Sequence, residues 1–229
     1  MWRALIGLTM LVSLIFVPMA PAVIVDGVAI AVGNKIITRS EIDLRIRLTA
    51  FQNNARPDLS PEQRREAAQR LIDQKLVERE MDLGRYPRRG MDAIPSLLDA
   101  YIKTNFHDSK AAFGASASTD GLTPAEIGAD LAWQSDFLNF LNLRFRPAVE
   151  VTEADIRKYF NEKFAPRISP EEQEATFSEL HPQIEEQLTV AGADRELDAW
   201  LKDQRQRTKI DYVEKDLMAA AANTEPTGQ

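Results

Sequence analysis

Apolar residues recur every three to four positions along most of the 229-residue chain, a period typical of amphipathic α-helices. The pattern therefore predicts a mainly α protein. Most helical stretches open with a Ser or Thr that can cap a helix, followed by proline or by an acidic or amide side chain. The predicted helices cover residues 41–51, 61–83, 95–106, 123–146, 152–164 and 173–207, with at most a short helix in the looser tract 107–121.

Start and stop signals bound these predicted helices. Ser40, with Asp43 three residues later, predicts the first start, and Ser60 followed by Pro61 predicts the second. Gly84 offers a left-handed stop after residue 83. The stripe of apolar residues over 61–83 predicts that this helix is central to the fold.

Two segments have the period of two that is typical of strands. "VDGVAIAVGNKIIT" contains a Gly33-Asn34 turn pair between two β-rich runs, which predicts a small β-hairpin. "KIDYV", over residues 209–213, predicts a late strand. Because an isolated hairpin is marginally stable, we expect the C-terminal strand to join it. Residues 214–229 are expected to form a disordered tail, because those after Met218 are small and polar.

The first 22 residues have the pattern of a cleaved secretory signal. Arg3 precedes an uncharged apolar run, which ends at Pro18 and a small-x-small triplet at Ala20-Pro21-Ala22. The mature chain would then begin at Val23. The alternative is an uncleaved membrane anchor, because residues 4–25 carry no charge and are long enough to cross a bilayer.

Composition excludes several classes of function. The chain carries 28 basic and 35 acidic residues, and no block of Lys or Arg stands out, so a nucleic-acid partner is not expected. The absence of cysteine excludes disulfides and thiolate chemistry. His107 and His181 are the only histidines; neither lies near a strand pattern, and His181-Pro182 falls at a predicted helix start. We therefore expect no catalytic residue, no metal site and no cofactor.

Four segments resemble, in this order, the chaperone domain of SurA-like periplasmic proteins, relatives of trigger factor. They are "VDGVAIAVGNKIITRSEIDLRI", "RLIDQKLVEREMDLG", "VTEADIRKYFNEKF" and "ELDAWLKDQRQRTKIDYV". The resemblance spans residues 25–213, is weakest over 85–125, and implies one chaperone domain over 23–213, with its hairpin and first helices in 23–164.

Members of that family often carry a parvulin-type prolyl isomerase domain after the helix that resembles "TEADIRKYFNEKF". Here the corresponding junction, residues 165–172, is only "APRISPEE". Ser169 and Pro170, with Glu171 and Glu172, are expected to cap the next helix directly. The resemblance thus implies a SurA-type core that lacks the isomerase domain.

The resemblance implies a periplasmic, ATP-independent chaperone, a holdase, which binds unfolded or outer-membrane-bound polypeptides. The alternative is a structural subunit, membrane-tethered or complex-bound, with one fixed protein partner. The membrane is a partner of the protein only if the signal segment stays uncleaved. A prolyl isomerase is the third reading, suggested by the family name alone.

Aromatic residues are the candidate client contacts. In the 123–146 helix, Trp133, Phe137 and Phe140 lie off the apolar stripe that runs through Leu131, Leu138, Leu141 and Phe145. They either pack in the core or contact a client, and the pattern leaves both open. Leu97, Tyr101 and Phe106 form the second candidate set. The helices at 61–83, 95–106 and 123–146 are expected to form a cradle around the client.

Overall fold

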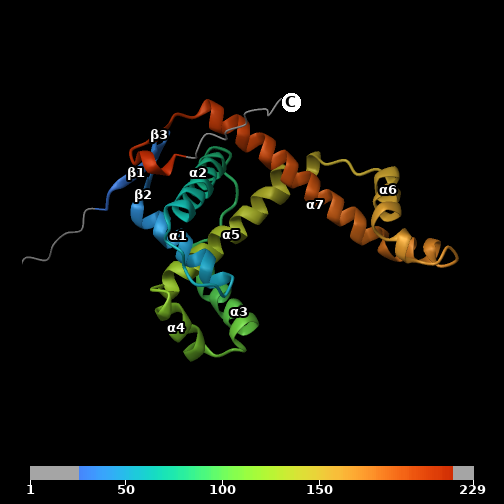
Figure 1. The fold of residues 1–229 in the computed structure, drawn as a ribbon, viewed down its shortest axis with the longest axis horizontal. Helices are drawn as coiled ribbons and strands as arrows, with labels where there is room; N and C mark the ends of the chain where they lie inside the picture. Colours follow the sequence, from blue (N-terminus) through green and yellow to red (C-terminus); the bar gives the residue numbers. More distant parts are fainter. Residues whose placement is uncertain (1–25, 219–229) are drawn as a thin grey trace, which may run out of the picture.

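The computed structural model describes residues 26–218 and confirms a mainly helical protein with a small antiparallel sheet (Figure 1). The predicted signal segment and the chain beyond Met218 lie outside the described residues. Figure 1 shows a body that holds the sheet and α1 to α5, and an arm in which α6 packs beside the far end of α7. Within residues 26–218 no helix has the length and apolar content that a membrane span requires.

The elements are β1 (Val28–Val32), β2 (Lys35–Thr38), α1 (Arg39–Gln52), α2 (Pro61–Leu83), α3 (Ile94–Phe106), α4 (Lys110–Thr119), α5 (Pro124–Arg144), α6 (Glu153–Lys163), α7 (Gln173–Arg207) and β3 (Ile210–Tyr212). Four short 3-10 turns separate or follow them: η1 (Met91–Ala93), η2 (Arg146–Ala148), η3 (Ala165–Arg167) and η4 (Lys215–Leu217).

The sheet joins the two ends of the described chain, as the period-two segments predict. Its order is β2-β1-β3, with both pairs antiparallel. Gly33 has φ +59° at the hairpin turn, a backbone conformation that favours glycine. Ile30 lies opposite Ile37 on one side and Tyr212 on the other, so these side chains share one face of the sheet.

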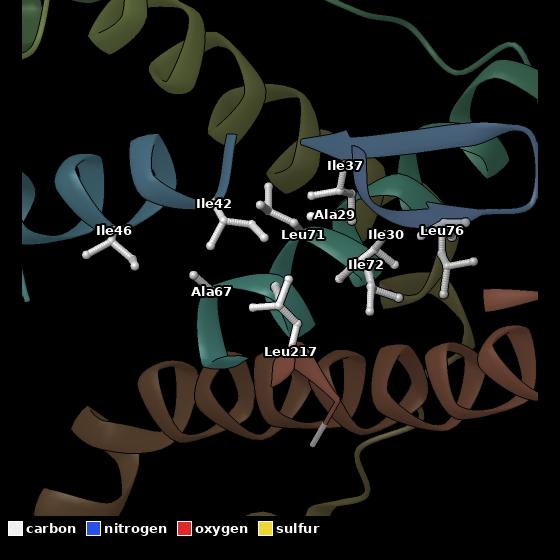
Figure 2. Close-up of a cluster of buried hydrophobic side chains, with 12 residues drawn as sticks. Ala29, Ile30, Ile37, Ile42, Ile46, Ala67, Leu71, Ile72, Leu76 and Leu217 are labelled. Carbon is white, nitrogen blue, oxygen red and sulfur yellow. The ribbon is translucent and has the colours of Figure 1, made fainter. Parts of the chain in front are cut away.

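That face packs on α2 to form the first core cluster (Figure 2). Ile30 and Ile37 from the sheet and Ile72 from α2 are fully buried. Leu217 of η4 closes the cluster and is only 3% exposed. The prediction of a disordered tail from residue 214 is therefore wrong for residues 214–217, because the chain after β3 turns back and places Leu217 among these side chains.

The first helix begins differently from the prediction. Its cap is Thr38, whose hydroxyl accepts from the backbone N–H of Glu41 at 3.2 Å while the Glu41 carboxylate accepts from the Thr38 N–H at 2.8 Å. Thr38 rather than Ser40 caps the helix, because Thr38 is the last residue of β2 and still has the extended backbone that a capping residue requires. Ser60 caps α2 as predicted, through its hydroxyl and the Gln63 N–H.

The stop after α2 also differs from the prediction. Gly84 has right-handed backbone, with φ −81°, and Arg85 takes the left-handed conformation at φ +52°. Gly84 still contributes to the turn because Tyr86 folds back over it, so that a Cβ atom at residue 84 would lie 2.5 Å from the Tyr86 ring.

A single continuous helix follows the junction. α7 begins at Gln173, after a turn in which the Glu172 N–H donates to the Ser169 carbonyl at 3.0 Å. The expected direct cap by Ser169 is wrong, because its hydroxyl bonds the Glu172 carboxylate rather than a backbone N–H of the helix. Pro182 lies inside α7, not at a helix start. The carbonyl of Ser178, four residues earlier, therefore loses its helical donor, but Ser178 is exposed to solvent.

The arm has an apolar cluster of its own. Ile156 and Phe160 of α6 pack against Phe177 and Ile184 of α7, and all four are buried. Thr152 caps α6 in a capping box with Asp155, as its sequence predicts.

Candidate client-binding groove

Helix α3 lies unusually close to α5 because α5 carries a glycine at the contact. A Cβ atom at Gly128 would lie 2.5 Å from Cγ2 of Ile94 and 3.1 Å from Cδ1 of Leu98. No real side chain tolerates the shorter distance, so the absence of a side chain at residue 128 sets the spacing of the two helices. Thr123 and Glu126 fix the start of α5 through a capping box, and Pro124 occupies its first turn.

Beside this contact the surface opens into an apolar groove of about 440 Å³ between α3, α4 and the start of α5. Ile102 and Phe113 are buried at its floor, and Leu98 forms part of its wall. The complete lining consists of Ile94, Pro95, Leu98, Asp99, Ile102, Lys110, Phe113, Gly114 and Pro124. Seven of these nine residues carry no charge or hydrogen-bonding side chain, so the groove can accept apolar groups with little loss of solvation of its own.

Gly114 gives this groove part of its width. It lies within α4, lines the groove, and has no other atom within 4 Å of the position that a Cβ atom would occupy. A glycine inside a helix is destabilising relative to alanine by about 1 kcal/mol. A larger side chain at residue 114 would therefore favour the helix and take up space beside or within the groove.

The rim of the groove carries one ion pair. Lys110 Nζ lies 2.9 Å from the Asp99 carboxylate, and both side chains are exposed. The hydrogen bond to Asp99 raises the pKa of the Lys110 ammonium, so this residue is charged throughout the physiological range. Because the pair joins α4 to α3, it spans the groove without contributing much stability at this exposure.

Behind the groove lies a cluster of four aromatic rings, Phe51, Tyr101, Phe106 and Phe113. Their ring centroids are 5.5 to 6.4 Å apart. Phe51 and Phe113 are buried, whereas Tyr101 and Phe106 are partly exposed. Burial raises the pKa of the Tyr101 hydroxyl, which stays neutral. Leu97 is half-buried on α3 and does not line the groove.

The aromatic residues of α5 divide between core and surface. Phe140 is fully buried and packs edge-to-face against Tyr86, Phe145 and Trp200. Its prediction as a client contact is therefore wrong, because neighbours from α2, α7 and the loop after α2 enclose this side of α5.

Trp133 and Phe137 are half-buried; their rings stack on each other with a centroid distance of 5.8 Å, and both pack against that same cluster. The apolar stripe predicted for α5 is also misplaced, because Leu138 is 59% exposed.

A second, smaller cavity of about 230 Å³ lies on the other side of α5, between α1 and α2. Asp130, whose side chain is 2% exposed, accepts hydrogen bonds there from Arg45 at 2.6 Å, Gln52 at 2.8 Å and Gln134 at 2.7 Å. Trp133 lines this cavity. The predicted cradle of three helices is thus split: α2 lines one cavity, α3 lines the other, and α5 lies between them.

The sequence does not reveal the Arg45–Asp130 pair. The two residues are 85 positions apart, and each lies on a helix that is rich in charged or amide side chains. The i, i+4 spacing of Asp130 and Gln134 is the one local signal, and it is common on solvated helices. Only the packing of α1 against α5 makes this carboxylate a buried one.

The two histidines lie apart. His107 is exposed and takes left-handed backbone where α3 ends. His181 contacts the Glu153 carboxylate at 2.7 Å and the Phe177 ring edge-on, which ties α7 to the start of α6. Within residues 26–218, no group of three or more potential ligand side chains is placed to hold a metal ion.

Comparison with known proteins adds no relative: no family model and no curated protein matches this chain.

Proposed function

We propose that this protein is a periplasmic, ATP-independent chaperone of the SurA type, which holds apolar segments of unfolded polypeptides, with outer-membrane protein precursors as the expected clients. The observation that carries the proposal is the apolar groove between α3, α4 and α5, a concave surface of about 440 Å³ with buried Ile102 and Phe113 at its floor. Its volume lies within the range of pockets that enclose small apolar ligands.

The groove suits a holdase because each contact with it is weak. Full burial of one large apolar side chain contributes about 1.5–3 kcal/mol, which is less than the roughly 4 kcal/mol of a millimolar complex. A client is then retained by several such contacts and released when its own folding removes them. Nucleotide hydrolysis is not required for that cycle.

The proposal assigns no isomerase activity to the chain. Its support is the junction between α6 and α7, where residues 164–172 form η3 and one turn that connect the two helices of the arm directly. In the family that the sequence resembles, this is the place at which the isomerase domain is inserted.

Gly114→Leu tests the groove. The new side chain should reduce the volume open to a client while α4 gains helix propensity, so the variant should fold and yet suppress aggregation of an unfolded outer-membrane protein several-fold less well than the wild type. Ala115→Leu is the matched control, because Ala115 is exposed on the same helix and does not line the groove. Circular dichroism would verify the fold of both. Full protection by a folded Gly114→Leu variant would rule the groove out.

Crosslinking in intact cells separates the holdase from a subunit with one fixed partner. A holdase should capture many β-barrel precursors, each in a small amount. A single partner recovered in stoichiometric amount would instead establish the structural subunit.

A further inference from the structure

The loop between α2 and η1 combines positive charge with exposed apolar side chains. Residues 83–91, which we call the basic loop, read "LGRYPRRGM" and contain three of the 28 basic residues of the chain and none of its 35 acidic residues. Leu83 at one end is 70% exposed and Met91 at the other is 86% exposed. These are the two most exposed large apolar side chains of residues 26–218.

Two backbone hydrogen bonds and one aromatic contact hold the loop against α2 and α5. The Tyr86 N–H donates to the Met81 carbonyl at 3.0 Å, and the Arg89 N–H donates to the buried Asp136 carboxylate at 2.8 Å. The Tyr86 ring packs against Phe140 with a centroid distance of 5.0 Å. The exposed side chains therefore project from a fixed support.

Two of the three guanidinium groups are available to a partner. Arg88 pairs with Asp82 at 2.9 Å and also donates to the Glu78 carbonyl. Arg85 and Arg89 are exposed, and neither side chain forms an ion pair with any residue between 26 and 218. The nearby Asp92 carboxylate folds back toward Gly90 without forming an ion pair with either arginine.

The end of α5 lies next to the end of α2, the helix from which the basic loop emerges. Arg144 in the last turn of α5 pairs with Glu80 in the last turns of α2 at 3.2 Å, which brings these two helix ends together. Leu143, next to Arg144, is 51% exposed. The basic loop thus combines exposed arginines with an exposed apolar side chain at each of its ends.

We propose that the basic loop docks the protein on a membrane surface rich in anionic lipids. Arginine and exposed apolar side chains in one patch match the two layers of such a surface, because the charges reach the headgroups while Leu83 and Met91 enter the boundary with the acyl chains. An acidic protein segment would satisfy the arginines but would leave Leu83 and Met91 in water. This inference is independent of the groove between α3, α4 and α5.

A single fluorophore can test the docking, because the chain contains no cysteine. Full-length protein with Met91→Cys would carry an environment-sensitive dye at one end of the basic loop, in place of one of the two apolar side chains that are proposed to enter the membrane. Leu59→Cys is the control label, since Leu59 is exposed just before α2, about 35 Å away along that helix. We expect the dye at residue 91, and not the dye at residue 59, to shift to the blue with vesicles that contain phosphatidylglycerol, and not with purely zwitterionic vesicles.

The charge variants then identify the residues responsible. Each basic residue near an anionic surface strengthens binding about fivefold. The double variant Arg85→Gln with Arg89→Gln should therefore bind anionic vesicles about thirtyfold more weakly, as followed by the dye at residue 91. Arg56→Gln with Arg65→Gln changes the net charge equally at the other end of α2 and should leave it unchanged.

Three outcomes would overturn the proposal: no shift at residue 91, an equal shift with zwitterionic vesicles, or an equal loss in both charge variants. A shift produced by polyglutamate but not by vesicles would overturn it in favour of an acidic protein partner. Because the measurement compares two positions in the full chain, insertion of the apolar segment at residues 4–25 does not mimic docking by the loop.

Discussion

The C-terminal segment should be required for stability up to Leu217 and dispensable after it. Leu217 is 3% exposed within the first core cluster, and its removal costs about 2–5 kcal/mol. Deleting the chain from Lys209 onward also removes β3, the Tyr212 hydroxyl that accepts from Gln69 at 3.1 Å, and the partner of the Gly33 N–H. Together these losses exceed about 5 kcal/mol, which is comparable to the whole stability of many domains.

Deletion from Met218 onward should change the free energy of unfolding by no more than about 0.5 kcal/mol, because Met218 is half-exposed and terminates η4. Thermal unfolding followed by circular dichroism compares the two truncations directly. The cut at Lys209 should abolish the cooperative transition or lower it by more than about 10 °C.

Point variants separate burial from chain length. Leu217→Ala should lower the melting temperature by roughly 6–12 °C, given about 3 kcal/mol and the size of the domain. Met218→Ala is the exposed control and should have little effect. Equal melting temperatures for the two truncations, or an unchanged Leu217→Ala variant, would refute the role assigned to η4 and β3.

Two further predictions concern charge. Asp130→Ala should lower the free energy of unfolding, measured in urea, by about 3–5 kcal/mol, because it leaves the partly buried Arg45 without its partner. Asp211→Ala removes an exposed ion pair and should lower that free energy by less than about 1 kcal/mol. Equal losses of stability in the two variants would contradict the role of Asp130 as a buried partner of Arg45. Hydrogen bonds from the backbone and hydroxyl of Thr123 lower the pKa of Glu126 below its ordinary value of 4.5. The stabilisation of the fold by the ionised Glu126 carboxylate is therefore complete above about pH 4.5 and is lost as the pH falls through the folded-state pKa. Glu126→Gln should therefore lose less stability than the wild type in urea titrations between about pH 6 and pH 3, and identical losses would argue against the capping box as the cause.

Local signals predict most of the secondary structure. Ser60 with Pro61 and Thr123 with Pro124 begin helices where the sequence places them, since a capping hydroxyl bonds a backbone N–H only three residues away. The addition of β3 to the hairpin is predicted as well, because no other segment in the sequence has the period of two that is typical of strands; the choice of β1 as its partner is not predicted.

Side-chain burial on α5 is harder to predict from sequence. A helix packed on one side has a single apolar stripe, but α5 meets α3 at Gly128 and the core around Phe140, while Asp130 faces α1. The spacing of apolar residues along the sequence therefore gives the wrong burial for Leu138, which is exposed, and for Phe140, which is buried. The groove is likewise not predicted, because it depends on the close approach of α3 to a glycine.

The basic loop does not stand out in the sequence as a positively charged segment. Three arginines among nine residues do not form a continuous run of positive charge. Leu83 and Met91 are of residue types that are usually buried in the core. Their significance lies in exposure and in the lack of ion-pair partners within the described chain, and both are properties of the fold.

The order β2-β1-β3 also determines when folding can finish. β1 lies at one end of the described chain and β3 and Leu217 at the other, yet β3 pairs with β1 and Leu217 packs in the same core cluster as Ile30 of β1. A ribosome or a secretion channel delivers the chain from its N-terminus, so the first helices emerge while the central strand still lacks one neighbour. Core closure is thus postponed until nearly the whole polypeptide has been delivered, and such long-range pairing is slow. For a chain that is exported, as we propose for this one, such a delay would favour passage through a narrow channel in an unfolded state.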